Sequence, residues 1–153
     1  MNRPLLFTAG SESYLRALRS VRVLTSLVFL MLGLVKLYIY FEMGLKPYES
    51  IVSAAGLPDV IKYYGITALV IEFYLAVGLW NRTHYQLSIV VAITMTTVGS
   101  LVGVALYVFK LNSECGCGLL GDNELFLLIQ KGLIITALYW LYKNKHFLFS
   151  SSD

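Results

Sequence analysis

Four long apolar stretches constrain the fold of this chain more than any other feature. They cover residues 23–41, 64–80, 85–109 and 124–142, and a helix needs about 20 residues to cross a bilayer. In hydrocarbon each backbone N–H and C=O must find a partner within its own segment, which favours helices. Strands of a membrane barrel would be about 10 residues long and would alternate in polarity. These stretches are longer and do not alternate. The sequence therefore predicts four transmembrane helices.

The composition agrees with a membrane protein of one domain. Of the 153 residues, 58% are hydrophobic and 14% are charged, whereas a soluble domain carries about 25% charged residues. Disordered chains are charged and poor in aromatic residues, so disorder is excluded. The first stretch is too long for a signal peptide and lacks a cleavage site after it. We expect one all-α domain over residues 1–153, an integral membrane four-helix bundle.

Lysine and arginine in the connections predict how the chain crosses the membrane. The net charge of +3 is small and dispersed, which argues against a nucleic-acid partner. One side of the predicted membrane carries Arg3, Arg16, Arg19, Arg22, Arg82, Lys143 and Lys145. The other side carries only Lys46, Lys62 and Lys110. Because basic residues favour the cytoplasmic side, we expect both termini on the cytoplasmic side and the connection over residues 110–123 on the outer side, in an oxidising compartment.

The long outer connection between the first two stretches contains a predicted short helix. Tyr48, Ile51, Val52 and Ala55 fall at helical spacing on one face, and glycine and proline at residues 56 and 58 follow them. We expect an interfacial helix that packs over the bundle. A docking surface, or a lid over the 110–123 connection, is the alternative interpretation. The third apolar stretch contains a G-x-x-x-G pattern at residues 99–103, which allows close helix contact.

Three ionisable residues lie inside the apolar stretches. At 1.5 Å per residue, Lys36, Glu72 and Lys131 lie about 8, 12 and 10 Å below the outer ends of their helices. Such residues are costly in hydrocarbon and need a partner or a cavity. We expect a buried cluster of these three, with Gln130 at its edge. The two lysines could instead extend separately towards the outer surface. A cluster could position helices, hold an acidic or quinone-like ligand, or relay protons.

Both cysteines lie in the outer connection, as Cys115-Gly116-Cys117-Gly118. Glycine at 116 and 118 leaves the sulfur atoms unhindered and allows positive φ. A disulfide between residues two apart closes a small ring, and strained, exposed disulfides exchange readily. A staple would gain little from so short a loop. Two thiolates alone do not complete a zinc site, although a metal shared with a partner, or an incidental structural role, stays open.

These motifs together resemble those of the MauE/DoxX-like family of redox-associated bacterial membrane proteins. The resemblance covers residues 33–142 and rests on Gly33-x-x-Lys36, Leu57-Pro58, Glu72 with Gly78-Leu79, and Cys115-Gly116-Cys117. It implies a four-helix membrane bundle that handles disulfides of exported proteins, often beside a thioredoxin-like partner. Use of a quinone as cofactor would be an analogy with other disulfide-forming membrane bundles.

Two functions follow as hypotheses. The first is a thiol–disulfide oxidoreductase in which Cys115 and Cys117 exchange disulfides with an exported thioredoxin-like or substrate protein. The cluster of Lys36, Glu72 and Lys131 would then stabilise a thiolate or an acceptor nearby. The second is a non-catalytic membrane anchor or assembly subunit of a larger envelope complex, which the single cysteine pair also allows. A small-molecule carrier is a weaker third interpretation because the chain has no internal repeat.

Overall fold

The computed structural model describes residues 9–54, 56, 58–108 and 124–149. Within them the fold is all-helical and contains no strand, which confirms the predicted all-α class for this part of the chain. The helices are α1 Ala9–Met43, α2 Lys46–Ala54, α3 Tyr64–Gly78, α4 Tyr85–Val108, α5 Glu124–Lys143 and α6 Lys145–Phe149, with a short 3-10 helix, η1, at Asp59–Tyr63.

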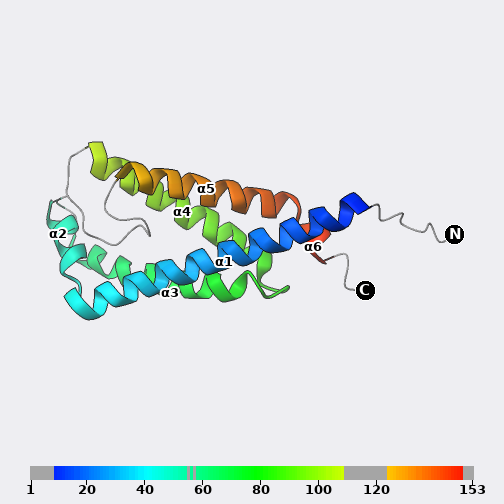
Figure 1. Ribbon diagram of the computed structural model, residues 1–153. Helices are drawn as coiled ribbons and strands as arrows, with labels where there is room; N and C mark the ends of the chain where they lie inside the picture. The colour runs from blue at the N-terminus through cyan, green and yellow to red at the C-terminus, as the bar shows by residue number, and fades with distance from the viewer. Residues whose placement is uncertain (1–8, 55, 57, 109–123, 150–153) are drawn as a thin grey trace.

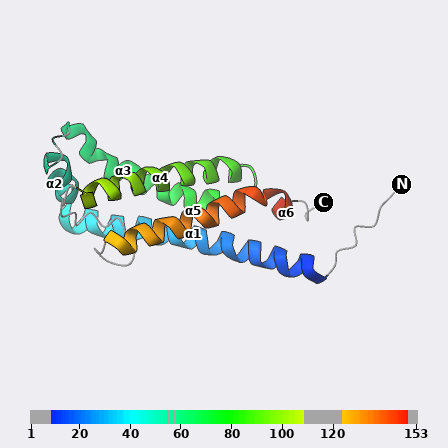
Figure 2. The ribbon, with the colours of Figure 1, turned by 90° about the horizontal axis from the view of Figure 1, so that it is seen from above.

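The four long helices lie side by side in antiparallel order (Figure 1 and Figure 2). Helix α1 packs on α3 and α5, and α4 packs on α3 and α5. One end of the molecule, here called the α2 end, holds α2 and η1 together with the end of α4 and the start of α5. The opposite end, the α6 end, holds α6, the start of α1 and the turn between α3 and α4.

Two of the described helices are long and apolar enough to cross a membrane, judged by length and composition. They are Glu12–Met43 and Asp59–Gly78, and the described part of α4 holds a shorter apolar helix, Tyr85–Leu101. In both long segments only 28% of the most apolar window is buried inside the bundle, so much of their apolar surface is left exposed. Burial of apolar surface drives soluble folding, and this outward-facing apolar surface fits a membrane protein. Crossing by all four long helices stays a prediction.

The residues buried between the helices form one apolar core along the bundle. Facing side chains from α1, α3, α4 and α5 meet there, and they include Phe29, Leu32, Leu75, Leu79, Ile89, Ala92, Ile134 and Leu138. They recur at helical spacing within each stretch, which is the pattern of a core-facing stripe. Helix α1 begins well before residue 23, and Leu18 from this early part is fully buried.

Polar and aromatic contacts attach α1 to the turn after α3, near the α6 end. The Ser26 hydroxyl donates a 2.6 Å hydrogen bond to the carbonyl oxygen of Ala76, and the indole N–H of Trp80 donates to the Ser26 oxygen at 2.8 Å. The guanidinium of Arg22 lies 5.5 Å from the centre of the Trp80 ring. These contacts of Trp80 fix the register of α1 against α3.

Candidate functional site

A buried ion pair joins α1 to α3 inside the bundle. The Lys36 ammonium donates a hydrogen bond to Oε1 of Glu72. The two side chains are 11% and 10% exposed. Glu72 belongs to the buried face of α3, which also carries Gly65, Ala68 and Leu75 at helical spacing. Since α1 packs on this face, the carboxylate meets the lysine from the neighbouring helix.

Lys131 of α5 approaches the same region from the other side. Its ammonium donates a hydrogen bond to the carbonyl oxygen of Gly99 in α4. A Cβ placed on Gly99 would lie 3.3 Å from Lys131 Nζ, so the glycine leaves space for the ammonium. The charges of Lys36 and Glu72 both act on Lys131. Among the described residues, no carboxylate pairs with Lys131. The formal charges of Lys36, Glu72 and Lys131 sum to +1.

One oxygen of the Glu72 carboxylate has no hydrogen-bond partner among the described residues. Oε2 is buried and accepts no hydrogen bond from any described residue, whereas Oε1 accepts from Lys36. Buried polar atoms in folded proteins nearly always have a hydrogen-bond partner, and an exception needs a reason. The cluster of Lys36, Glu72 and Lys131, here called the charge cluster, therefore combines a net positive charge with an unused acceptor. That combination suits a polar molecule or a developing anion.

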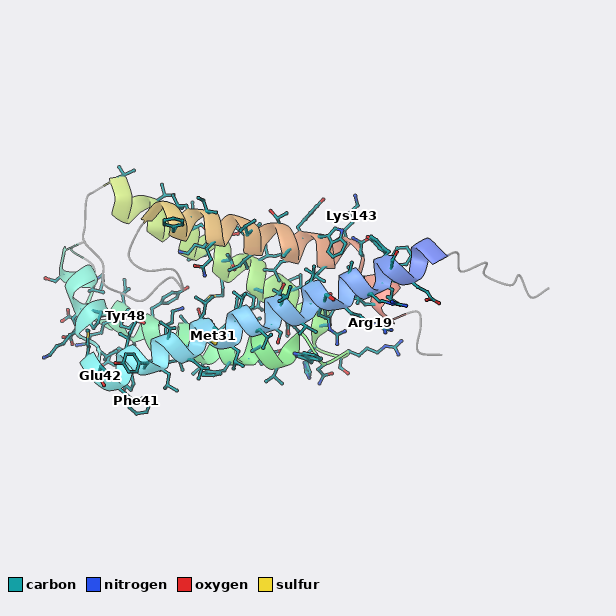
Figure 3. All side chains as sticks on the ribbon, in the orientation of Figure 1. Arg19, Met31, Phe41, Glu42, Tyr48 and Lys143 are labelled. Carbon is teal, nitrogen blue, oxygen red and sulfur yellow. The ribbon has the colours of Figure 1, made fainter. Side chains whose placement is uncertain are left out.

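Tyr48 of α2 covers the face of α3 that leads to the charge cluster. A Cβ on Gly65 would lie 2.7 Å from Cε1 of the Tyr48 ring, so the ring occupies the space that the glycine leaves. Burial, and then the negative charge of Glu72, raise the pKa of the Tyr48 phenol. The sequence places Tyr48 on the inward face of the short helix but gives no sign that it sits against Gly65. Figure 3 shows Tyr48 at the α2 end.

All three charged residues lie at similar depth below the α2 end. At 1.5 Å per residue, Lys36 lies about 10 Å from the end of α1 and Lys131 about 10 Å from the start of α5. Glu72 lies about 12 Å from the start of α3 by the same measure. Helix α4 ends and α5 begins at this end of the bundle (Figure 1). The charge cluster is therefore nearer to α2 than to α6.

Most of the chain matches one protein family. The family model described as "Methylamine utilisation protein MauE" matches residues 13–143. This chain belongs to the MauE family. The match runs from α1 to the end of α5 and so includes every residue of the charge cluster. The family resemblance seen in the sequence motifs is thereby confirmed. No curated protein and no solved structure matches the chain.

The remaining site residues expected for this MauE-family chain are not all placed by the structure. Cys115, Gly116, Cys117 and Gly118 lie outside the described residues. Gln130 precedes Lys131 on α5 and is partly buried, and its place at the edge of the charge cluster stays a prediction. Among the described residues, no group of three or more His, Cys, Asp or Glu side chains could hold a metal ion.

Proposed function

We propose that this MauE-family chain is a four-span membrane protein that exchanges disulfides through Cys115 and Cys117. The observation that carries the proposal is the position of the charge cluster. It lies in the half of the bundle where α4 ends and α5 begins, and the two cysteines belong to the connection between these helices. A net positive charge below a dithiol favours the thiolate form, which is the reactive form of cysteine.

The distribution of basic residues supports an orientation with the cysteines outside. Arginine and lysine gather at the α6 end, where Figure 3 labels Arg19 and Lys143. Basic residues in short connections favour the cytoplasmic side, so the α2 end faces the periplasm across a bacterial inner membrane. Disulfides form and persist in that compartment. Residues 1–153 then act as a single domain.

The proposed reaction is a two-electron exchange. A thiolate of an exported thioredoxin-like or substrate protein attacks one sulfur of the Cys115–Cys117 disulfide. The S–S bond breaks, a mixed disulfide forms, and the other cysteine leaves as a thiolate. A second thiolate of the partner then attacks the mixed disulfide. The partner ends with a disulfide, and Cys115 and Cys117 end reduced. Lys131 and Lys36 favour the departing thiolate through their positive charge.

Trapping of the mixed disulfide tests this function. Cys115→Ser and Cys117→Ser each leave one thiol, which can run the exchange in reverse by attacking the disulfide of an oxidised partner. The second cysteine that would resolve this mixed disulfide from within the chain is then missing. We expect at least one variant to accumulate a covalent complex with an exported protein, seen on non-reducing gels and lost on reduction. The double variant is the control and should form none.

The opposite result would favour the anchor or assembly role. If neither single variant captures a protein, and the double variant supports normal oxidation of exported thiols, the exchange role is wrong. A large partner that co-purifies with the wild type and with the double variant alike would then identify a non-catalytic subunit.

A further inference from the structure

We propose that α2 is a hinged lid over the charge cluster, that Tyr48 is the residue that seals it, and that its opening admits small water-soluble molecules to Glu72. The proposal goes beyond disulfide exchange, because it involves no cysteine and stands whether or not the exchange role is correct. It rests on the hinges of α2, the fit of Tyr48, the small residues below it, and the unused oxygen of Glu72.

Both ends of α2 carry a glycine in a left-handed conformation. Gly44 has φ +64° just before the helix, and Gly56 has φ +63° just after it. Only glycine adopts this region without a steric penalty. At neither glycine would an added Cβ meet an atom within 4 Å, so local packing does not require the absence of a side chain. The left-handed backbone conformation is what requires glycine at these two positions. It places a turn at each end of the lid.

The seal consists of the Tyr48 ring against the backbone of Gly65. The ring fills the position that a side chain at residue 65 would take. Below it on the same buried face of α3 follow Ala68 and then Glu72. Gly65 and Glu72 are two helical turns apart, about 10 Å along the axis. Small side chains therefore line α3 from the ring down to the carboxylate, and moving the ring would open the way from the α2 end.

The attachment of the lid is asymmetric in strength. Val52 of α2 is buried, with 4% of its surface exposed, and α2 packs on η1. On its outer side the Lys62 ammonium of η1 donates a 3.1 Å hydrogen bond to Oε1 of Glu49. Exposed ion pairs contribute little to stability. The buried contacts of α2 therefore contribute more to the closed position of the lid than the ion pair between Lys62 and Glu49 does.

In the closed state no described residue donates a hydrogen bond to Glu72 Oε2, which lies in a cluster of formal charge +1. A buried acceptor without a partner is costly, and a polar molecule admitted past Tyr48 could remove that cost by donating a hydrogen bond. The lid thus separates a state in which the cluster is sealed from a state in which it is solvated.

A water-soluble carbodiimide tests the lid directly. The reagent activates the Glu72 carboxyl, the neighbouring Lys36 amine displaces the urea, and an amide forms with net loss of one water, which mass spectrometry detects. We expect slow cross-linking in the full-length wild type. In Tyr48→Ala the rate of cross-linking should rise about tenfold or more. Removing a packed aromatic ring costs more free energy than a tenfold change in an equilibrium constant represents.

Matched variants separate the seal from general loosening. Tyr48→Phe keeps the ring and should stay slow. Tyr63→Ala removes an exposed tyrosine at the same end and should also stay slow. The same reagent adds to the Glu12 carboxyl, which is 68% exposed, and the O-acylisourea rearranges without a leaving group to a stable N-acylurea, whose mass increase serves as the internal measure of reagent activity in every sample.

Each outcome decides the proposal. An unchanged rate in Tyr48→Ala, an equal acceleration in Tyr63→Ala, or a wild-type rate as fast as that of Glu12 would overturn it. If Tyr48→Ala does not fold, Gly65→Ala displaces the same ring from the other side and must accelerate the cross-link instead. The measurement repeated in the double cysteine-to-serine variant should give the same rates, which keeps it separate from the exchange test.

Discussion

Breaking the buried ion pair between Lys36 and Glu72 should destabilise the bundle strongly, and removing the glutamate should cost more than removing the lysine. Two unit charges about 4 Å apart attract by about 4 kcal/mol at an effective dielectric constant near 20. Removing one partner of a buried pair typically costs about 3–5 kcal/mol, because the other charge is left uncompensated. Glu72→Gln raises the charge of the cluster from +1 to +2, whereas Lys36→Met lowers it to 0 and leaves Lys131 to act on Glu72. We therefore expect Glu72→Gln to cost more.

The quantity to measure is the free energy of unfolding in mixed micelles. Tryptophan fluorescence monitors unfolding during a titration with a denaturing detergent. The matched control is Glu12→Gln, which removes the carboxylate of an exposed ion pair with Arg16. Exposed pairs of this kind are worth only a few tenths of a kcal/mol, at most about 1. The double variant Lys36→Met with Glu72→Met should recover most of the loss, since apolar replacement of a buried pair is often neutral or stabilising.

Two results would refute this reasoning. If Glu72→Gln costs no more than Glu12→Gln, the ion pair does not contribute to the stability of the bundle. If the double variant loses the sum of the two single losses, the two side chains act independently, and the coupling between them is absent.

Three further predictions concern the packing around the site. Gly65→Ala should cost about 1–3 kcal/mol through overpacking against Tyr48, whereas Gly132→Ala, with open space around it, should be neutral or stabilising in thermal unfolding; equal effects would contradict the contact. The Tyr48 phenol should ionise above pH 10, so the contribution of its neutral form to the docking of α2 is complete below that pH and is lost as the pH rises. The difference between the ultraviolet titrations of the wild type and Tyr48→Phe gives the midpoint of this ionisation. A midpoint at or below pH 10 would contradict the prediction. Trp80→Phe should cost about 1 kcal/mol by removing the donor to Ser26. The loss in thermal unfolding should be smaller in a Ser26→Ala background, and an equal loss would contradict the hydrogen bond.

The sequence predicts depth along the helices well because helical rise is constant. Positions in the apolar stretches sufficed to place Lys36, Glu72 and Lys131 at one level. The partner that each would choose depends on how each helix is rotated about its axis, which the sequence pattern does not specify. Lys36 bonds to Glu72, whereas Lys131 bonds to the backbone of Gly99. The glycine pattern in that stretch indicates close approach but not that a lysine uses the space.

The role of Tyr48 shows a second limit of the sequence. Helical spacing identifies it as facing inward on the short outer helix. Its contact with Gly65 depends on how that helix lies across α3, and the helix is flanked by left-handed glycines at residues 44 and 56. Gly65 is the available signal, since a glycine within an apolar helix often marks a close approach. Only the tertiary arrangement identifies which side chain approaches it.

The most direct test of the central claim is the accessibility of Cys115 and Cys117 in intact cells. A membrane-impermeant maleimide, applied to cells after mild reduction, labels thiols that face the periplasm. We predict labelling of both cysteines in intact cells, with little labelling before reduction. Labelling of these cysteines only after the membrane is opened would place them in the cytosol and would contradict disulfide exchange with exported proteins.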